Sequence, residues 1–253
     1  MPVDPTARLA GCTVTQEKTE AVVLRGVDFS ESSRVVTFLT PSRGLLACMA
    51  KGVRRKGSAL ACCLVNLNRV EVVFQHKPGR EVQTLFEATL LDGYRGLRVD
   101  ADKGFYAAFP AELAGRAAQA EEPSEALYGV LVRGLKDFEA WDGDRRTHAV
   151  WQALRLLDAA GFAPVLEHCL DSGAAPGASP GFCYEGGVVS SAARADLRLT
   201  PRQYEELKML AGARRECPLR ESDPGLFRLA WHYARRQLDA DFRSARVLQE
   251  MYG

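Results

Sequence analysis

The chain has 253 residues, of which 47% are hydrophobic and 26% charged, and a formal net charge of +1. This composition is typical of a folded globular protein with two or three compact units, and it excludes a largely disordered or collagen-like chain. No apolar stretch approaches the roughly 20 residues of a transmembrane helix, so we expect no membrane span. The seven cysteines lack regular spacing, which favours reduced thiols in the cytoplasm over a secreted disulfide scaffold.

The N-terminal part of the chain is predicted to form a small β-barrel. Residues 1–16 contain two prolines and no basic segment followed by a long apolar run, so we expect a flexible extension rather than a secretion signal. Between residues 17 and 91, short β-rich runs alternate with turn residues. The predicted strands are Ala21–Leu24, Arg34–Leu39, Gly44–Ala50, Arg69–Phe74 and Val82–Phe86. Five strands in about 70 residues favour an OB-fold, a five-stranded barrel known for binding oligonucleotides.

Beyond residue 100 the pattern changes to alanine- and leucine-rich stretches with helical spacing. The predicted helices cover Phe105–Gln119, Ser124–Trp141 and Arg145–Ala160. Residues 171–181 have no apolar periodicity and are expected to form a flexible loop. Thr200 followed by Pro201 is a typical helix start, and the last helix is predicted to run from Pro224 to about Leu248.

The strongest local signal for binding is the segment Lys51–Lys56, which carries four cations in six residues. It follows a predicted strand and leads into a Gly57-Ser58 turn. Lysine and arginine side chains at such an edge neutralise successive phosphates, which gives the salt-dependent, sequence-independent affinity expected for single strands. Residues 17–91 hold eleven lysines and arginines against seven acidic residues, which suggests a basic face. Three arginines in or beside the preceding strands are candidates to extend this face: Arg25, Arg34 and Arg43. A solvated cationic loop without a ligand is the alternative.

Four phenylalanines lie near this segment. Phe38, Phe74 and Phe86 occupy apolar strand positions, so core packing is their expected role. Phe29 lies in a polar loop and is the candidate for stacking on a base.

No catalytic site is predicted. The four histidines are scattered, and the sequence has neither a glycine-rich phosphate loop of the Walker type nor a paired-carboxylate motif. A hydrolase built on Cys169 and His168 is an alternative from another class, although sequence neighbours rarely form a nucleophile and base pair. A metal site that adds Cys183 and Cys217 lacks the close ligand pairs of structural zinc, so buried or incidental thiols are the expected state.

Several segments together resemble the N-terminal signature of the RecO family in order and in spacing: Glu17–Leu24, Asp28–Thr40, Arg43–Leu46 and Ala50–Arg55. Further along, Gly161-Phe-Ala-Pro164 is similar to the family's Gly-Phe/Tyr-x-Pro segment, which closes a helix before a zinc-binding region. Phe182–Val189 resembles the stretch around the family's Gly-Gly pair. The resemblance covers residues 17 to about 190.

This resemblance implies an α+β protein with an N-terminal five-stranded OB-fold barrel, followed by a helical domain with a degenerate, cysteine-poor zinc-knuckle-like insertion. The corresponding divisions are a flexible extension (1–16), an OB-fold (17–91), a helical domain (92–164), a knuckle-like region (165–199) and C-terminal helices packed on the helical domain (200–253).

The resemblance further implies a cytoplasmic, nucleoid-associated mediator of DNA repair and recombination that is not an enzyme. Such a protein binds single- and double-stranded DNA, anneals complementary strands, interacts with single-strand-binding protein, and works with RecR to load RecA. The DNA contacts that it implies here are Arg25, Arg34, Lys51, Arg54, Arg55 and Lys56. The alternative is an architectural adaptor that binds RecR and single-strand-binding protein and has little DNA affinity of its own.

One departure from the family concerns zinc. Many RecO proteins have a Cys-x-x-Cys pair before the Gly-Gly stretch and a second pair after it. Here Cys169 alone matches, Ser172 occupies the second position, and Gly186-Gly187 is followed by Val-Val-Ser-Ser-Ala-Ala-Arg. We therefore expect the knuckle to persist without metal, and we expect no other cofactor.

Overall fold

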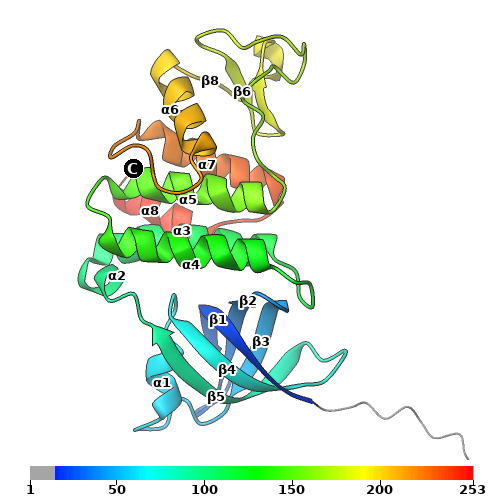
Figure 1. Ribbon diagram of the computed structural model, residues 1–253, viewed down its shortest axis with the longest axis vertical. Helices are drawn as coiled ribbons and strands as arrows, with labels where there is room; N and C mark the ends of the chain where they lie inside the picture. The colour runs from blue at the N-terminus through cyan, green and yellow to red at the C-terminus, as the bar shows by residue number, and fades with distance from the viewer. Residues whose placement is uncertain (1–14, 253) are drawn as a thin grey trace, which may run out of the picture. The chain divides into compact units, whose positions relative to one another are not determined.

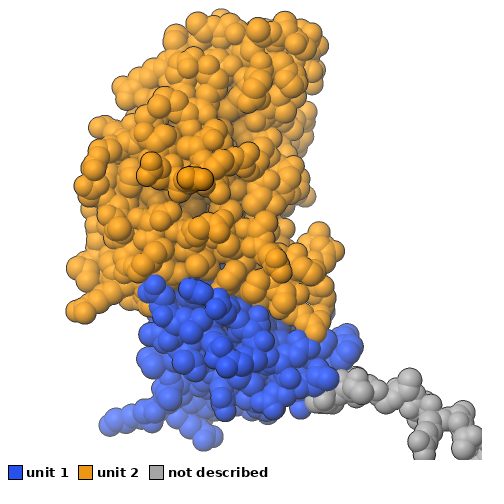
Figure 2. Space-filling model, in the orientation of Figure 1, with its two compact units in different colours: residues 1–38, 46–92 blue, residues 39–45, 93–253 orange. Residues whose placement is uncertain are grey.

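The computed structural model describes residues 15–252, which form two compact units (Figures 1 and 2). The barrel unit comprises residues 15–38 and 46–92, and the helical unit comprises residues 39–45 and 93–252. Most of the expected extension, residues 1–14, lies outside the described residues, and its last two residues begin the first strand. Within residues 15–252, no helix is both long and apolar enough to cross a membrane.

Five strands close into a barrel in the order β1-β2-β3-β5-β4. The strands are β1 (Thr15–Asp28), β2 (Arg34–Thr40), β3 (Gly44–Ala50), β4 (Arg69–His76) and β5 (Val82–Asp92). β1 and β4 pair antiparallel from Thr15 opposite His76 to Val22 opposite Arg69, whereas β3 and β5 are parallel. These two pairings join β1–β3 to the β4–β5 hairpin and complete the barrel. The predicted fold class, an OB-type barrel followed by helices, is confirmed (Figure 1).

Alternate strand residues fill the barrel, because successive side chains of a strand point to opposite faces. In β4, Val70, Val72 and Phe74 are fully buried, while the residues between them are partly exposed. Phe38 of β2 is also fully buried, so the core role expected for Phe38 and Phe74 is confirmed. A short helix, α1 (Ala59–Cys63), follows β3 and adds Cys63 to this core.

The expected core role of Phe86 is wrong, because its side chain is 46% exposed. On the paired strand, Val73 lies opposite Glu87 and Phe74 lies opposite Leu85, which leaves Phe86 as the extra residue of a β-bulge. The bulge shifts the alternation of β5 by one position. Leu85 therefore fills the core and Phe86 faces outward.

Helices dominate residues 93–252. They are α2 (Gly96–Val99), α3 (Ala101–Ala117), α4 (Glu125–Ala140), α5 (Arg145–Ala159), α6 (Pro201–Gly212), α7 (Gly225–Gln237) and α8 (Arg243–Tyr252). The three helices predicted between residues 105 and 160 are α3, α4 and α5. The central one is α5, which packs on α3, α4, α6 and α7. Its first turn is capped by the Asp144 carboxylate, which accepts a 2.9 Å hydrogen bond from the Thr147 N–H.

The single C-terminal helix predicted from Pro224 to about Leu248 is wrong, because the chain forms α7 and α8 there. Asp239 lies between them with φ 43°, a left-handed conformation that ends a right-handed helix. Phe242 follows the break and is almost fully buried, with its ring centroid 5.6 Å from that of Phe109. The break therefore allows α8 to pack on α3.

The knuckle-like region is more ordered than a loop. It contains a three-stranded sheet in the order β7-β6-β8, formed by β6 (Gly181–Cys183), β7 (Gly187–Val189) and β8 (Leu197–Arg198), and a 3-10 turn, η1 (Ala192–Arg194). Phe182 is fully buried, and its ring centroid lies 5.7 Å from that of Tyr233 in α7. The sequence predicts a flexible loop over residues 171–181: residues 171–180 form no helix or strand, but Gly181 begins β6.

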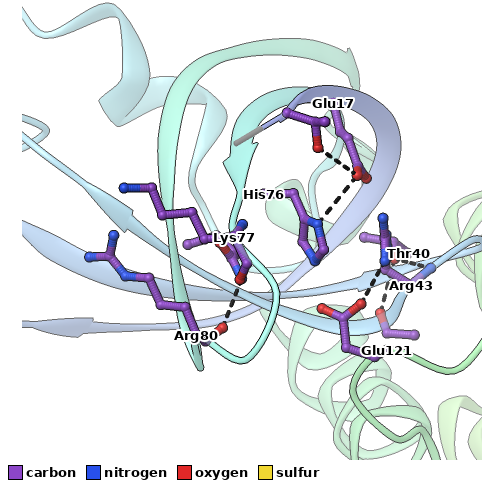
Figure 3. Close-up of polar contacts among 10 residues, drawn as sticks. Glu17, Thr40, Arg43, His76, Lys77, Arg80 and Glu121 are labelled. Carbon is purple, nitrogen blue, oxygen red and sulfur yellow. Dashed lines mark hydrogen bonds and ion pairs between the residues drawn. The ribbon is translucent and has the colours of Figure 1, made fainter. Parts of the chain in front are cut away.

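The β2–β3 turn is fixed by polar contacts within the helical unit (Figure 3). Thr40 Oγ1 donates to the Gly44 carbonyl and accepts from the Arg43 N–H, both at 3.1 Å. The Arg43 guanidinium forms a 2.6 Å ion pair with Glu121. Arg43 is therefore held by an acidic partner.

Candidate nucleic-acid interface

The basic segment forms a loop between β3 and α1, and we call residues 51–57 the basic loop. Gly52 and Gly57 adopt φ values of 71° and 80°, conformations that suit glycine and turn the chain sharply at both ends. Val53 points into the barrel core and is 4% exposed, while Arg54, Arg55 and the two lysines of the loop are exposed. One buried valine thus anchors a loop whose cations face solvent.

The β1–β2 turn holds one side of the basic loop. Asp28 accepts a 2.8 Å hydrogen bond from Arg34 Nε through Oδ1, and its Oδ2 lies 3.5 Å from Arg54 Nε. The hydrogen bond from Arg34 and the charges of both arginines lower the pKa of the Asp28 carboxyl group. Arg54 also donates from Nη1 to the Ser30 carbonyl at 3.1 Å and from its backbone N–H to the Ser32 carbonyl at 3.2 Å.

Arg34 reaches Asp28 by crossing Gly26. A Cβ atom at position 26 would lie 2.6 Å from Arg34 Cδ, so a side chain there would displace the arginine. Glycine at position 26 therefore makes room for the contact between Arg34 and Asp28.

The six predicted DNA contacts do not share one environment. The structure brings Arg34 and Arg54 together at Asp28. Within residues 15–252, the side chains of Lys51, Arg55 and Lys56 form no hydrogen bond or ion pair, so they are available to an anion from solvent. Arg25 is exposed on β1, and its Nε lies 3.4 Å from Thr37 Oγ1, a long hydrogen bond.

Phe29, the predicted stacking residue, lies in the same turn as Asp28 and is 69% exposed. The turn is closed by the Phe29 N–H, which donates to the Ser33 carbonyl at 3.0 Å. The phenyl ring is therefore presented to solvent by an ordered turn beside two arginines.

The β4–β5 loop carries two further cations, Lys77 and Arg80, which were not among the predicted DNA contacts (Figure 3). Gln83 is 2% exposed and fixes this loop: its Oε1 accepts from the Lys77 N–H at 2.9 Å, and its Nε2 donates to the Arg80 carbonyl at 2.7 Å. Figure 3 shows both basic side chains extending away from the pair formed by His76 and Glu17. In OB-folds the β1–β2 and β4–β5 loops contact oligonucleotides, so the turn Lys77-Pro-Gly-Arg80 contained a usable signal.

The knuckle-like region does not fit a zinc ion. Cys169 is 3% exposed and has no thiolate partner at position 172, which is a serine. Residues 188–194, after Gly187, contain no cysteine, so the second cysteine pair of a zinc site is missing as well. Among residues 15–252, no group of three or more histidine, cysteine or acidic side chains is placed to hold a metal.

A carboxylate joins the two halves of the region instead. Asp171 Oδ1 accepts from the Ser190 N–H and hydroxyl, both at 2.9 Å, and Oδ2 accepts from the Ser191 N–H at 2.7 Å. These backbone hydrogen bonds lower the pKa of Asp171 to about 2. The contact spans the two stretches in which the family's cysteine pairs are expected.

The geometry does not favour a cysteine hydrolase. Cys169 is buried, its N–H donates to the Ala174 carbonyl at 2.8 Å, and the side chain of His168 is exposed. A buried thiol beside an exposed imidazole lacks the arrangement of an activated nucleophile.

Comparison with known families agrees with this architecture. The family description "Recombination protein O N terminal" matches residues 14–94, and "Recombination protein O C terminal" matches residues 98–244. The chain belongs to the RecO family. Its relatives include proteins named "DNA repair protein RecO" from Salinibacter ruber, 33% identical over 152 residues, and from Bacillus subtilis, 30% identical over 154 residues.

These two alignments cover 59% and 60% of this RecO-family chain and 58% and 59% of the respective relatives. A third relative, "DNA repair protein RecO" from a Nocardioides strain, is 36% identical over 161 residues, which is 61% of this chain and 63% of the relative. The chain therefore aligns with about three fifths of the length of these relatives.

Proposed function

We propose that this RecO-family chain is a mediator of DNA repair and recombination that binds single- and double-stranded DNA through its barrel unit. The observation that carries the proposal is the basic loop, in which Val53 is anchored in the core while Lys51, Arg55 and Lys56 face solvent without a partner among the described residues. The family and the printed names of the relatives support a role in DNA repair.

Binding in this proposal depends on phosphates. Each cation that neutralises a phosphate releases a condensed counterion, so affinity falls as salt rises and depends little on sequence. Phe29 adds stacking on an unpaired base, which every base accepts through its π face. Lys77 and Arg80 provide cations from the second loop that OB-folds use.

Annealing follows from this mode of binding. A protein that binds the backbone and neutralises its charge lowers the repulsion between two complementary strands and leaves base edges free to pair. We further propose the partners that the family resemblance implies, namely RecR, single-strand-binding protein and, through them, RecA. The chain has no enzymatic role in this proposal, and the knuckle-like region folds without zinc or another cofactor.

A strand-annealing assay tests the proposal. Two complementary oligonucleotides carrying a fluorescence donor and an acceptor are mixed with the full chain, and the rate of pairing is followed. Acceleration by the parent chain, and its loss when Lys51, Arg55 and Lys56 are all replaced by alanine, is the expected result. A parent chain that binds RecR but neither binds DNA nor accelerates pairing would favour the adaptor.

A further inference from the structure

A second cluster of cations lies in the helical unit, where four arginines surround one small hollow. They are Arg133 of α4, Arg155 of α5, and Arg214 and Arg215 of the segment after α6. The acidic side chain in the lining is Asp137, and the nearby Asp158 carboxylate is bound to Arg214. Arg133 and Arg215 are exposed, and their side chains have no hydrogen bond or close ion pair within residues 15–252. The Asp137 carboxylate attracts Arg133 and Arg155 electrostatically, so four arginines face two carboxylates, Asp137 and Asp158. The hollow is therefore positively charged.

Arg155 is the least exposed of the four arginines. Its Nη1 donates to the Arg214 carbonyl, and its guanidinium lies 5.7 Å from the centre of the Trp151 ring. Its Nε is buried and has no acceptor among the described residues. A buried donor without an acceptor, among like charges, costs free energy that a bound anion would offset.

The size of the hollow limits what enters it. Its volume is about 20 Å³, which holds roughly one water-sized group. Pockets for small molecules are far larger, about 300–1,000 Å³. A single oxygen atom of an oxyanion fits in this volume, and the exposed guanidinium groups of Arg133 and Arg215 would bind other oxygens of the same anion in the paired geometry that arginine favours.

The apolar part of the lining argues against a peptide. Val130 and Trp151 are its apolar side chains, and they are 8% and 3% exposed. Peptide recognition commonly rests on apolar or aromatic anchors that enter a pocket, and these two side chains offer no such pocket. A charged backbone with repeated oxyanions matches the site better than an acidic peptide does.

We propose that this arginine hollow is a second binding site for the DNA backbone, located on the helical unit and specific for phosphate oxygens. The inference rests on the proposed DNA-binding function and adds a site that the basic loop does not include. Its contribution is electrostatic, so it raises the number of counterions released on binding.

The test is the salt dependence of oligonucleotide binding by the full chain, measured by fluorescence anisotropy. The variant Arg133→Ala/Arg215→Ala removes two exposed cations of the hollow and leaves Arg155 and its packing in place. The control Arg228→Ala/Arg243→Ala removes two exposed arginines of α7 and α8, so the change in net charge is the same. A second pair, Arg133→Gln/Arg215→Gln, keeps longer side chains if the alanine variant unfolds at a lower temperature.

The Arg133→Ala/Arg215→Ala variant should bind a single-stranded oligonucleotide more weakly at low salt. The magnitude of its slope of log K against log salt should be lower than that of the parent by about 1.4, which is about 0.7 for each phosphate that is no longer neutralised. The control should match the parent chain. Equal slopes in the parent and the hollow variant, with weakened binding in a basic-loop variant, would overturn this inference and leave the proposed function intact. Binding of labelled polyglutamate is measured in the same way. If the Arg133→Ala/Arg215→Ala variant loses polyglutamate binding but binds DNA as the parent chain does, the hollow would be assigned to acidic proteins and the proposal would be overturned. A parent chain that binds no DNA would overturn both.

Discussion

The Asp28 carboxylate lies 3.5 Å from the Arg54 guanidinium, so an acidic side chain of the β1–β2 turn neutralises a central cation of the basic loop. Asp28 also accepts the 2.8 Å hydrogen bond from Arg34. Two of the six predicted DNA contacts are therefore paired within the protein, and a phosphate must compete with Asp28 for them. Asp28 limits the affinity of the barrel for DNA in this account.

Replacing Asp28 by asparagine should tighten DNA binding. The substitution removes the competing charge while keeping a side chain of similar shape, so Arg34 and Arg54 become free for phosphates. We expect a several-fold gain in affinity at low salt and a salt slope steeper by about 0.7 to 1.4 for a single strand, which corresponds to one or two further neutralised phosphates. The matched control is Glu31→Gln, which removes an exposed negative charge from the same turn. Weaker binding by Asp28→Asn, or an equal gain in the control, would show that Asp28 does not restrain the arginines.

Replacing Arg54 and Arg55 by alanine should weaken binding to all sequences alike. Both side chains lie on the exposed side of the basic loop, whereas Val53, which anchors it, is unchanged. The magnitude of the slope of log K against log salt should fall by about 0.7 to 1.4 for a single strand, because Arg55 no longer neutralises a phosphate and Arg54, for which a phosphate competes with Asp28, no longer neutralises a second one. The comparison uses oligonucleotides of several sequences at several salt concentrations. Unchanged affinity and an unchanged slope would remove both arginines from the site.

Local patterns in the sequence predicted the strands, the first long helices and the basic loop, because alternation, helical spacing and charge runs are properties of neighbouring residues. The outward position of Phe86 depends on a β-bulge that is defined by pairing with β4. No glycine lies beside Phe86 to indicate a bulge from the sequence. The break at Asp239 likewise lacks a glycine or proline. The approach of Asp28 to Arg54 and the arginine hollow both join residues distant in sequence, so only the fold reveals them.

Replacing Asp171 by alanine should loosen the knuckle-like region. Its carboxylate accepts hydrogen bonds from Ser190 and Ser191, so their amide hydrogens should exchange with solvent faster in the variant. Because the folded pKa is lowered to about 2, this contribution to stability is present above the ordinary value of 3.8 and is lost as the pH falls toward 2. Hydrogen exchange at neutral pH measures the effect, and Ser172→Ala serves as the control. Unchanged exchange would contradict the role of Asp171.

The purified chain should contain no stoichiometric zinc, because Cys169 stands without the three other cysteines of the family's site. Elemental analysis after purification without chelator checks this. One zinc ion per chain, whose removal by a chelator unfolds residues 165–199, would contradict a metal-free knuckle.

Unfolding of the helical unit should depend on the protonation of His148. Burial first, and then the charge of Lys103, lower the pKa of this side chain to about 3. Its ring is stacked on that of Phe138, with the two ring centroids 4.4 Å apart. Neither imidazole nitrogen has a hydrogen-bond partner among the described residues. Below pH 6.5, the ordinary pKa of histidine, the unfolded chain binds a proton on His148 and the folded chain does not. The stability of the folded chain therefore falls as the pH drops below 6.5.

The expected decrease in stability from His148 between pH 7 and pH 5 is about 2 kcal/mol, measured by urea unfolding at the two pH values. His148→Gln should lower stability at pH 7 but remove most of this pH dependence. His168→Gln changes an exposed side chain and should leave the dependence unchanged. An identical pH dependence in His148→Gln and the parent would exclude His148 as its source.

The most direct test of the central claim is fluorescence anisotropy of labelled single- and double-stranded oligonucleotides with the full chain over a range of salt concentrations. We predict binding to both, with little sequence preference and with affinity that falls linearly on logarithmic axes as salt rises. No binding at low salt would contradict DNA recognition by the barrel and leave the protein as an adaptor for partner proteins.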